Sequence, residues 1–143
     1  MDLYRGYGAQ TGYLCGFPTT GVRWERAALT PDEVLSVSYI DWSYWLELSG
    51  GTRSPRRAAE RIRDGHTPYG VSNDGFATMA RMVGHGHLFP ELIVASTGEP
   101  DARTVCVEGH ARLTAYALAA DALPPQMDVL LATSPDVAAW WAY

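Results

Sequence analysis

Three short, mostly apolar runs bounded by glycine and proline constrain the fold of this chain more than any other feature. They cover 92–95, 104–107 and 127–131. Runs of this length between such breakers predict buried β-strands. A helical pattern precedes the first run and another lies between the second and third. The order helix, strand, strand, helix, strand predicts an α+β fold with a small mixed β-sheet and packed helices.

Residues that start and stop helices predict where the helices lie. A threonine or serine before a proline marks an N-terminus, and glycine marks an end. In Thr30-Pro31-Asp32-Glu33 the glutamate completes a capping box. The expected helices run from Thr30 to Val37, from the cap Asp41 through Trp42 to Leu48, from Ser54 to Gly65, from Asn73 to Gly84, from the Glu108–Arg112 segment to about Ala120, and from Ser134 through Trp140 and Trp141. Residues 1–21 are expected to form loops and a short strand.

Composition limits the class of protein. With 143 residues, 47% hydrophobic and 19% charged, the chain is expected to form one soluble domain over residues 1–143, in which residues 1–70 carry aromatic and arginine-rich helices. There are two cysteines, no apolar run of membrane-spanning length and no signal-peptide pattern at the start. We therefore expect a cytoplasmic protein, with Cys106 as a buried core thiol.

All eleven basic residues are arginine. The absence of lysine excludes a Schiff-base lysine and a Walker-type phosphate loop, which both need an amine. Five arginines and one glutamate between Arg53 and Arg63 give that segment a local charge of +4 in a chain of net charge −5. The segment is either a solvated helix face or an anion site, and the acidic balance argues against bulk nucleic-acid binding.

The segment Glu108-Gly109-His110-Ala111-Arg112 joins a predicted strand to a predicted helix. Free amides at a helix start attract anions, and Arg112 in the first turn favours a phosphate or carboxylate beside it. Thr114 adds a hydroxyl, and His110 has the chemistry to shuttle a proton. The alternative is structural: Glu108 pairs with Arg112, and His110 caps the helix.

The stretch from Asn73 to Leu131 resembles the ParB/sulfiredoxin-like domain. The residues that carry the likeness are Gly86-His87-Leu88-Phe89-Pro90-Glu91-Leu92-Ile93-Val94, then Val107-Glu108-Gly109-His110-Ala111-Arg112-Leu113-Thr114, then Pro124 and Val129-Leu130-Leu131. Sulfiredoxins have a catalytic cysteine where this chain has His110. Partition proteins have Gly-Glu-Arg-Arg, and no helix-turn-helix domain follows here. The segment Glu108-Gly109-His110-Ala111-Arg112 is closest to the Asp-Gly-His-His-Arg of the free serine kinases, with Ala111 in place of the second histidine.

The resemblance implies a nucleotide (ATP, ADP or CTP), with or without Mg²⁺, whose phosphates bind Gly109, His110 and Arg112. Glu108 would serve the metal or act as base with His110. Thr114 would add a hydroxyl donor to the anion, and Arg53 would close over it. The implied reaction is phosphoryl or nucleotidyl transfer to a small metabolite. The alternatives are a non-catalytic module that binds a nucleotide or protein, including a second copy of the chain, and a DNA-binding protein. The four histidines predict no metal site of their own.

Overall fold

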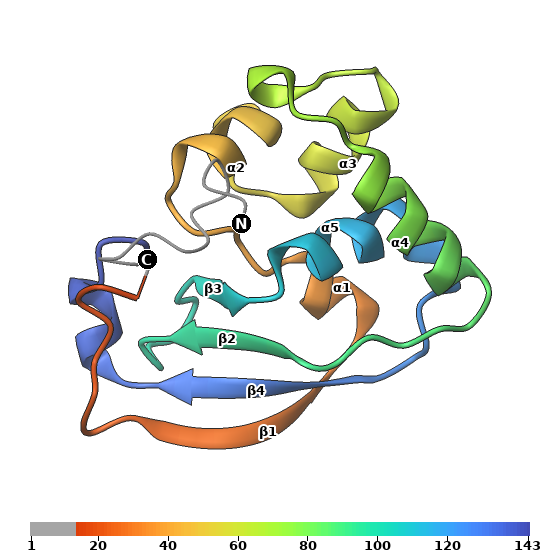
Figure 1. The fold of residues 1–143 in the computed structure, drawn as a ribbon. Helices are drawn as coiled ribbons and strands as arrows, with labels where there is room; N and C mark the ends of the chain where they lie inside the picture. The colour runs from red at the N-terminus through yellow and green to blue at the C-terminus, as the bar shows by residue number, and fades with distance from the viewer. Residues whose placement is uncertain (1–13) are drawn as a thin grey trace.

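The sheet of the computed structural model, which describes residues 14–143, has four strands in the order β1-β4-β2-β3. β1 pairs antiparallel with β4, β4 pairs parallel with β2, and β2 pairs antiparallel with β3 (Figure 1). The strands are β1 (Arg23–Leu29), β2 (Leu92–Ser96), β3 (Thr104–Glu108) and β4 (Met127–Thr133). The three predicted strands are therefore confirmed as β2, β3 and β4.

Five α-helices accompany this mixed sheet in the described part of the chain, which confirms the α+β class. They are α1 (Pro31–Leu35), α2 (Ser43–Leu48), α3 (Pro55–Arg63), α4 (Asp74–Gly84) and α5 (His110–Leu118), with the 3₁₀ turns η2 (Pro68–Gly70), η3 (Ala120–Ala122) and η4 (Pro135–Ala139). α5 packs against α3 and α4 (Figure 1). It lies at the centre of the helical layer, so its start is surrounded by other elements.

The predicted capping residues of α1 and α3 are confirmed. The hydroxyl of Thr30 accepts from the amide of Glu33 at 3.2 Å, and the Thr30 amide donates to the Glu33 carboxylate at 3.0 Å. Ser54 accepts from the amide of Arg57, and Pro55 takes the first helical position. These caps satisfy amides that have no partner within the helix.

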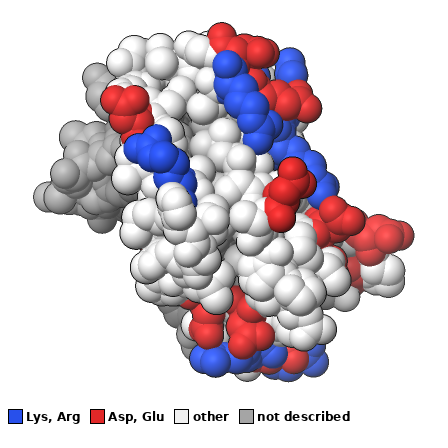
Figure 2. Space-filling model, turned by 90° about the vertical axis from the view of Figure 1, so that its right-hand side faces the viewer, with Lys and Arg blue, Asp and Glu red and all other residues white. Residues whose placement is uncertain are grey.

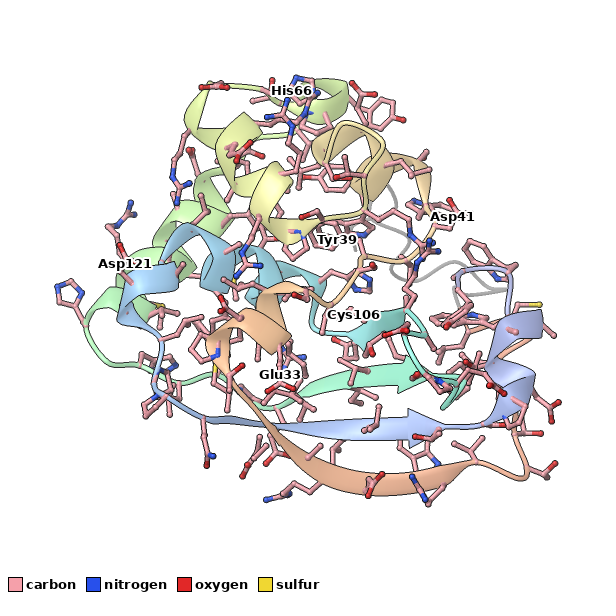
Figure 3. The ribbon with its side chains drawn as sticks, turned by 180° about the vertical axis from the view of Figure 1, so that it is seen from behind. Glu33, Tyr39, Asp41, His66, Cys106 and Asp121 are labelled. Atoms are coloured by element: carbon pink, nitrogen blue, oxygen red, sulfur yellow. The ribbon has the colours of Figure 1, made fainter. Side chains whose placement is uncertain are left out.

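The prediction that Asp41 caps α2 is wrong, because the N-cap is Trp42. Asp41 is the residue before this cap. Its amide donates to the carbonyl of Ala142 at 3.0 Å, so Asp41 lies beside the C-terminal segment (Figure 3). The final helix also differs from the prediction. It is the 3₁₀ turn η4, and Trp140 and Trp141 follow it. α5 ends at Leu118 rather than near Ala120.

Strand β1 has no counterpart among the predicted elements. None of its seven residues is buried, and it lies at the edge of the sheet as described, paired with β4 alone. Its first four residues are exposed and only Ala27 and Leu29 are half-buried, so the strand shows little of the apolar alternation that predicts a strand. The predicted short strand within residues 1–21 falls mainly outside the described residues.

The segment after α1 lies beside β3 and brings α1 and α2 to the start of α5. Ser38 forms a parallel bridge with Val105, with its amide 2.8 Å from the Thr104 carbonyl and its carbonyl 2.8 Å from the Cys106 amide. Cys106 is fully buried there, and burial raises the pKa of its thiol, as expected of a core cysteine. Figure 3 labels Tyr39 on this segment, on the side of the helices above it.

Candidate functional site

The turn between β3 and α5 is built around Gly109. Its φ is +108°, in the left-handed region, and its carbonyl accepts from the Leu113 amide at 2.8 Å to start α5. No side chain caps the helix at this residue. A Cβ atom at Gly109 would lie 2.5 Å from Cδ2 of Leu92, so the turn requires glycine on both steric and conformational grounds.

Gly109→Ala should therefore lower the free energy of unfolding by about 2 kcal/mol, since it adds backbone strain and a close contact with Leu92. Chemical denaturation measures the change. Gly75→Ala is the matched control, because that glycine lies in α4 and a Cβ there meets no atom within 4 Å. An equal effect of the two substitutions would contradict the constraint at Gly109.

Arg112 connects α5 to the segment before β2. Its Nη1 donates to the carbonyls of Pro90 at 2.7 Å and Glu91 at 3.1 Å. Its Nη2 lies 3.5 Å from the carboxylate of Glu108, and the two side chains are 16% and 47% exposed. The predicted Glu108–Arg112 ion pair thus exists, and it leaves the Glu108 carboxylate half exposed at the surface of the turn.

His110 lies inside the core. It is fully buried, and its ring stacks on Trp45 at a centroid distance of 5.1 Å and on Tyr39 at 6.1 Å. Its Nε2 accepts from the Ile40 amide at 3.4 Å. Burial, with the nearby charge of Arg112, lowers the pKa of His110 to about 3. The ring is therefore neutral at physiological pH and positions the start of α5 against the segment after α1.

Thr114 is buried beside it. Its hydroxyl donates to the His110 carbonyl at 2.8 Å and shares a hydrogen bond of 2.7 Å with the hydroxyl of Tyr39. The structure therefore places Thr114 in the internal hydrogen-bond network. Among the site residues predicted in this turn, the Glu108 side chain is half exposed and the Arg112 side chain is exposed only in part.

Arg53 is placed where the chain folds back on its C-terminal residues. Its Nε donates to the Tyr39 carbonyl at 2.8 Å, and its Nη1 and Nη2 donate to Tyr143 and Ala142, each at 2.9 Å. The residue is 8% exposed. Burial, together with the charge of Arg103, lowers the pKa of this guanidinium. An anion at Arg53 would have to displace these carbonyls.

The other arginines of the basic segment also have partners. Arg56 pairs with Asp32 and Arg57 with Glu60, each at 2.6 Å. Arg61 donates to the carbonyls of Leu48 and Glu47, and Arg63 to that of Leu118. On the face shown in Figure 2, blue and red side chains lie next to one another. The arginines of this segment thus have carboxylate or carbonyl partners within the protein, which favours the solvated-face interpretation.

The remaining histidines lie apart from the turn. His66 is 3.4 Å from the Glu47 carboxylate, His85 bonds to the Arg81 carbonyl, and His87 contacts the ring of Phe89. Within residues 14–143, no three histidine, cysteine or acidic side chains gather closely enough to hold a metal ion. Magnesium at the turn would have to arrive with a nucleotide and take Glu108 as its protein ligand.

The segment over the start of α5 is the structural element of the site that the prediction missed. Residues 36–40 read Ser-Val-Ser-Tyr-Ile, where the apolar Val37 and Tyr39 alternate with Ser36 and Ser38. This alternation is typical of a strand, and it could have indicated that the segment extends α1 along the sheet. It explains the burial of His110, which contacts Tyr39 and the Ile40 amide.

Hollows of about 950 and 410 Å³ occur on the described surface, and neither of these two is lined by Gly109, His110 or Arg112. Comparison with protein-family models, curated proteins and solved structures finds no match to this chain. The resemblance to the ParB/sulfiredoxin-like domain therefore rests on the residues themselves. Among the described helices, none combines the length and apolar character required to cross a bilayer.

Proposed function

We propose that this chain has a ParB/sulfiredoxin-like fold and binds the phosphates of a nucleotide at the turn from Glu108 to Arg112. The observation that carries the proposal is the start of α5. It opens on a left-handed glycine without a side-chain cap, and the Arg112 guanidinium lies against that glycine. Amides at a helix start and an adjacent guanidinium are the groups that bind phosphate.

The residues of the turn fit this ligand incompletely. The amides that open α5 and the Arg112 guanidinium would hold a phosphate oxygen. Glu108, half exposed beside Arg112, is the carboxylate placed to bind the metal of a nucleotide or to accept a proton from a substrate hydroxyl. His110 and Thr114 contribute by fixing the turn from inside the core. Arg53 stabilises the C-terminal residues.

The proposed reaction is phosphoryl or nucleotidyl transfer to a small hydroxylated or amino-acid-like metabolite, in the cytoplasm. A positioned carboxylate that accepts the substrate's proton contributes about 10²–10⁴ in rate. Glu108→Gln keeps the size of the side chain and removes this capacity. It also removes a negative charge beside the phosphates, so nucleotide binding should be retained.

The experiment combines thermal-shift measurements and product analysis with ATP, ADP and CTP, with and without magnesium. A nucleotide at a hundred times its dissociation constant should add about 2.7 kcal/mol of stability. Glu108→Gln should keep this shift and lose turnover by at least about 100-fold. Glu99→Gln, an exposed glutamate in the loop between β2 and β3, is the matched control. The proposal fails if no nucleotide stabilises the protein, and the role of Glu108 fails if its variant turns over normally.

A non-catalytic module is the second candidate, and the burial of His110 favours it, because one predicted catalytic group cannot meet a ligand in this arrangement. Trp24 and Trp141 are 54% and 41% exposed, and such side chains often anchor contacts with a protein partner, here including a second copy of the chain. Nucleotide binding without product, or concentration-dependent association, would identify this class. The paired arginines of α3 do not favour DNA binding.

A further inference from the structure

The larger of the two hollows is a groove of about 950 Å³ between α1 and one face of the sheet. Its floor is apolar: Ala27, Leu29 and Leu131 are partly exposed there, and Val94 and Val129 lie among them, each 1% exposed. The strand pairing aligns Ala27 with Val129 and Val94 with Leu131, so these side chains share one face of the sheet. The groove is at the upper end of the range for small-molecule sites.

The rim of the groove is acidic. The carboxylates of Asp32, Glu33 and Asp101 line it against one cation, Arg103. Asp32 pairs with Arg56, which lies outside the lining, so Glu33 and Asp101 against Arg103 leave the rim with a net charge of −1. Figure 3 shows Glu33 on α1, where that helix lies beside the strands. Asp101 and Arg103 belong to the loop that leads into β3, so the charges come from two separate segments of the chain.

The groove also has an aromatic wall. Tyr143 lines it, and the Tyr143 hydroxyl donates to the Arg103 carbonyl at 2.8 Å, which fixes the ring beside the rim. An aromatic face attracts a cation, as a carboxylate does. An apolar floor, an acidic rim and a fixed phenol together favour a ligand with an apolar body and a positive charge, and they disfavour an anion such as a nucleotide.

We propose that this groove binds a small organic cation with an apolar body, of the arylalkylamine class. The apolar portion would lie on the β1, β2 and β4 floor, and the ammonium group would lie between Glu33 and Asp101. None of the residues of the nucleotide turn lines the groove, so the proposal stands independently of the phosphate site.

Two substitutions remove the charges without disturbing the backbone. Glu33→Gln retains the capping box of α1, because glutamine serves at that position as glutamate does. Asp101 has a φ of +60°, and asparagine adopts this left-handed conformation at least as readily as aspartate. Asp121→Asn is the matched control, since Asp121 is an exposed carboxylate of η3 that does not line the groove.

The test uses tryptamine and indole-3-propionate as probes, which share an indole ring and carry opposite charges. Titration followed by NMR at low salt should show saturable binding of tryptamine, with shifts of residues on the groove floor, and at least about tenfold weaker binding of indole-3-propionate. Each of Glu33→Gln and Asp101→Asn should weaken tryptamine binding about three- to fivefold, and Asp121→Asn should not. Ala27→Leu, which fills the floor, should weaken the binding of both probes.

The proposal is overturned if tryptamine does not bind saturably at millimolar concentrations, or if the two probes bind equally. It is also overturned if the shifted residues lie outside the groove, or if neither charge-removing variant changes the affinity for tryptamine. A second outcome, binding of tryptamine that Asp121→Asn weakens as much as Glu33→Gln does, would show a general attraction to an acidic protein and would reject the site.

Discussion

Acidification from about pH 7 to about pH 4 should remove roughly 3 kcal/mol of unfolding free energy through His110 alone. The unfolded chain binds this proton below about pH 6.5, whereas burial lowers the pKa in the folded protein to about 3. Between these values the unfolded state holds more protons, so stability falls as the pH falls. The contribution is fully present above pH 6.5, and the loss is complete below the folded pKa.

The measurement is chemical denaturation across this pH range for the wild-type protein and for His110→Phe. Phenylalanine keeps a ring between Trp45 and Tyr39 but cannot titrate or accept from the Ile40 amide. The variant should be less stable at pH 7 by about 1–3 kcal/mol and should have a flatter pH dependence below 6.5. His87→Phe, a change at an exposed histidine, is the control. An unchanged slope in His110→Phe would show that the core holds His110 differently.

Arg53→Met should lower the free energy of unfolding by about 3 kcal/mol, because it removes the guanidinium donor of the Tyr39 and Ala142 carbonyls and leaves the Tyr143 carbonyl with that of Arg103 alone. Methionine preserves the apolar stem of the side chain. It also preserves the backbone strain of this position, where φ is +61°, so the difference reports the guanidinium.

Arg57→Met is the matched control for the guanidinium. Arg57 forms an ion pair with Glu60 on the surface of α3, where such pairs contribute little. Its loss should change the unfolding free energy by less than about 0.5 kcal/mol. A similar small change in Arg53→Met would contradict the structural role of Arg53.

The elements with strong local determinants were predictable from the sequence. The box formed by Thr30 and Glu33, the cap at Ser54 and the apolar runs of β2, β3 and β4 each specify their structure within a few residues. Trp42 is the cap of α2 in place of Asp41, and the Asp41 amide bonds to Ala142, about a hundred residues away. Such a contact leaves no local pattern in the sequence.

The same distinction applies to the candidate site. The glycine turn and the Glu108–Arg112 pair follow from spacing alone, and the structure contains both. The burial of His110 and Thr114 depends on residues 36–40 lying over α5, and the partners of Arg53 lie at the other end of the chain. Residue type indicates what a side chain can do chemically, whereas these long-range contacts decide whether it meets solvent.

The bridge between Ser38 and Val105 affects whether strands of other molecules can pair with this sheet. It occupies the hydrogen-bonding groups on the outer side of β3, so a foreign strand cannot extend the sheet there at that point. In the described part of the chain, β1 is the opposite border, and charged side chains at Arg23, Glu25 and Arg26 discourage such pairing along it. Strand addition, the first step of amyloid-like growth, is thereby opposed at the two borders of the described sheet by different means.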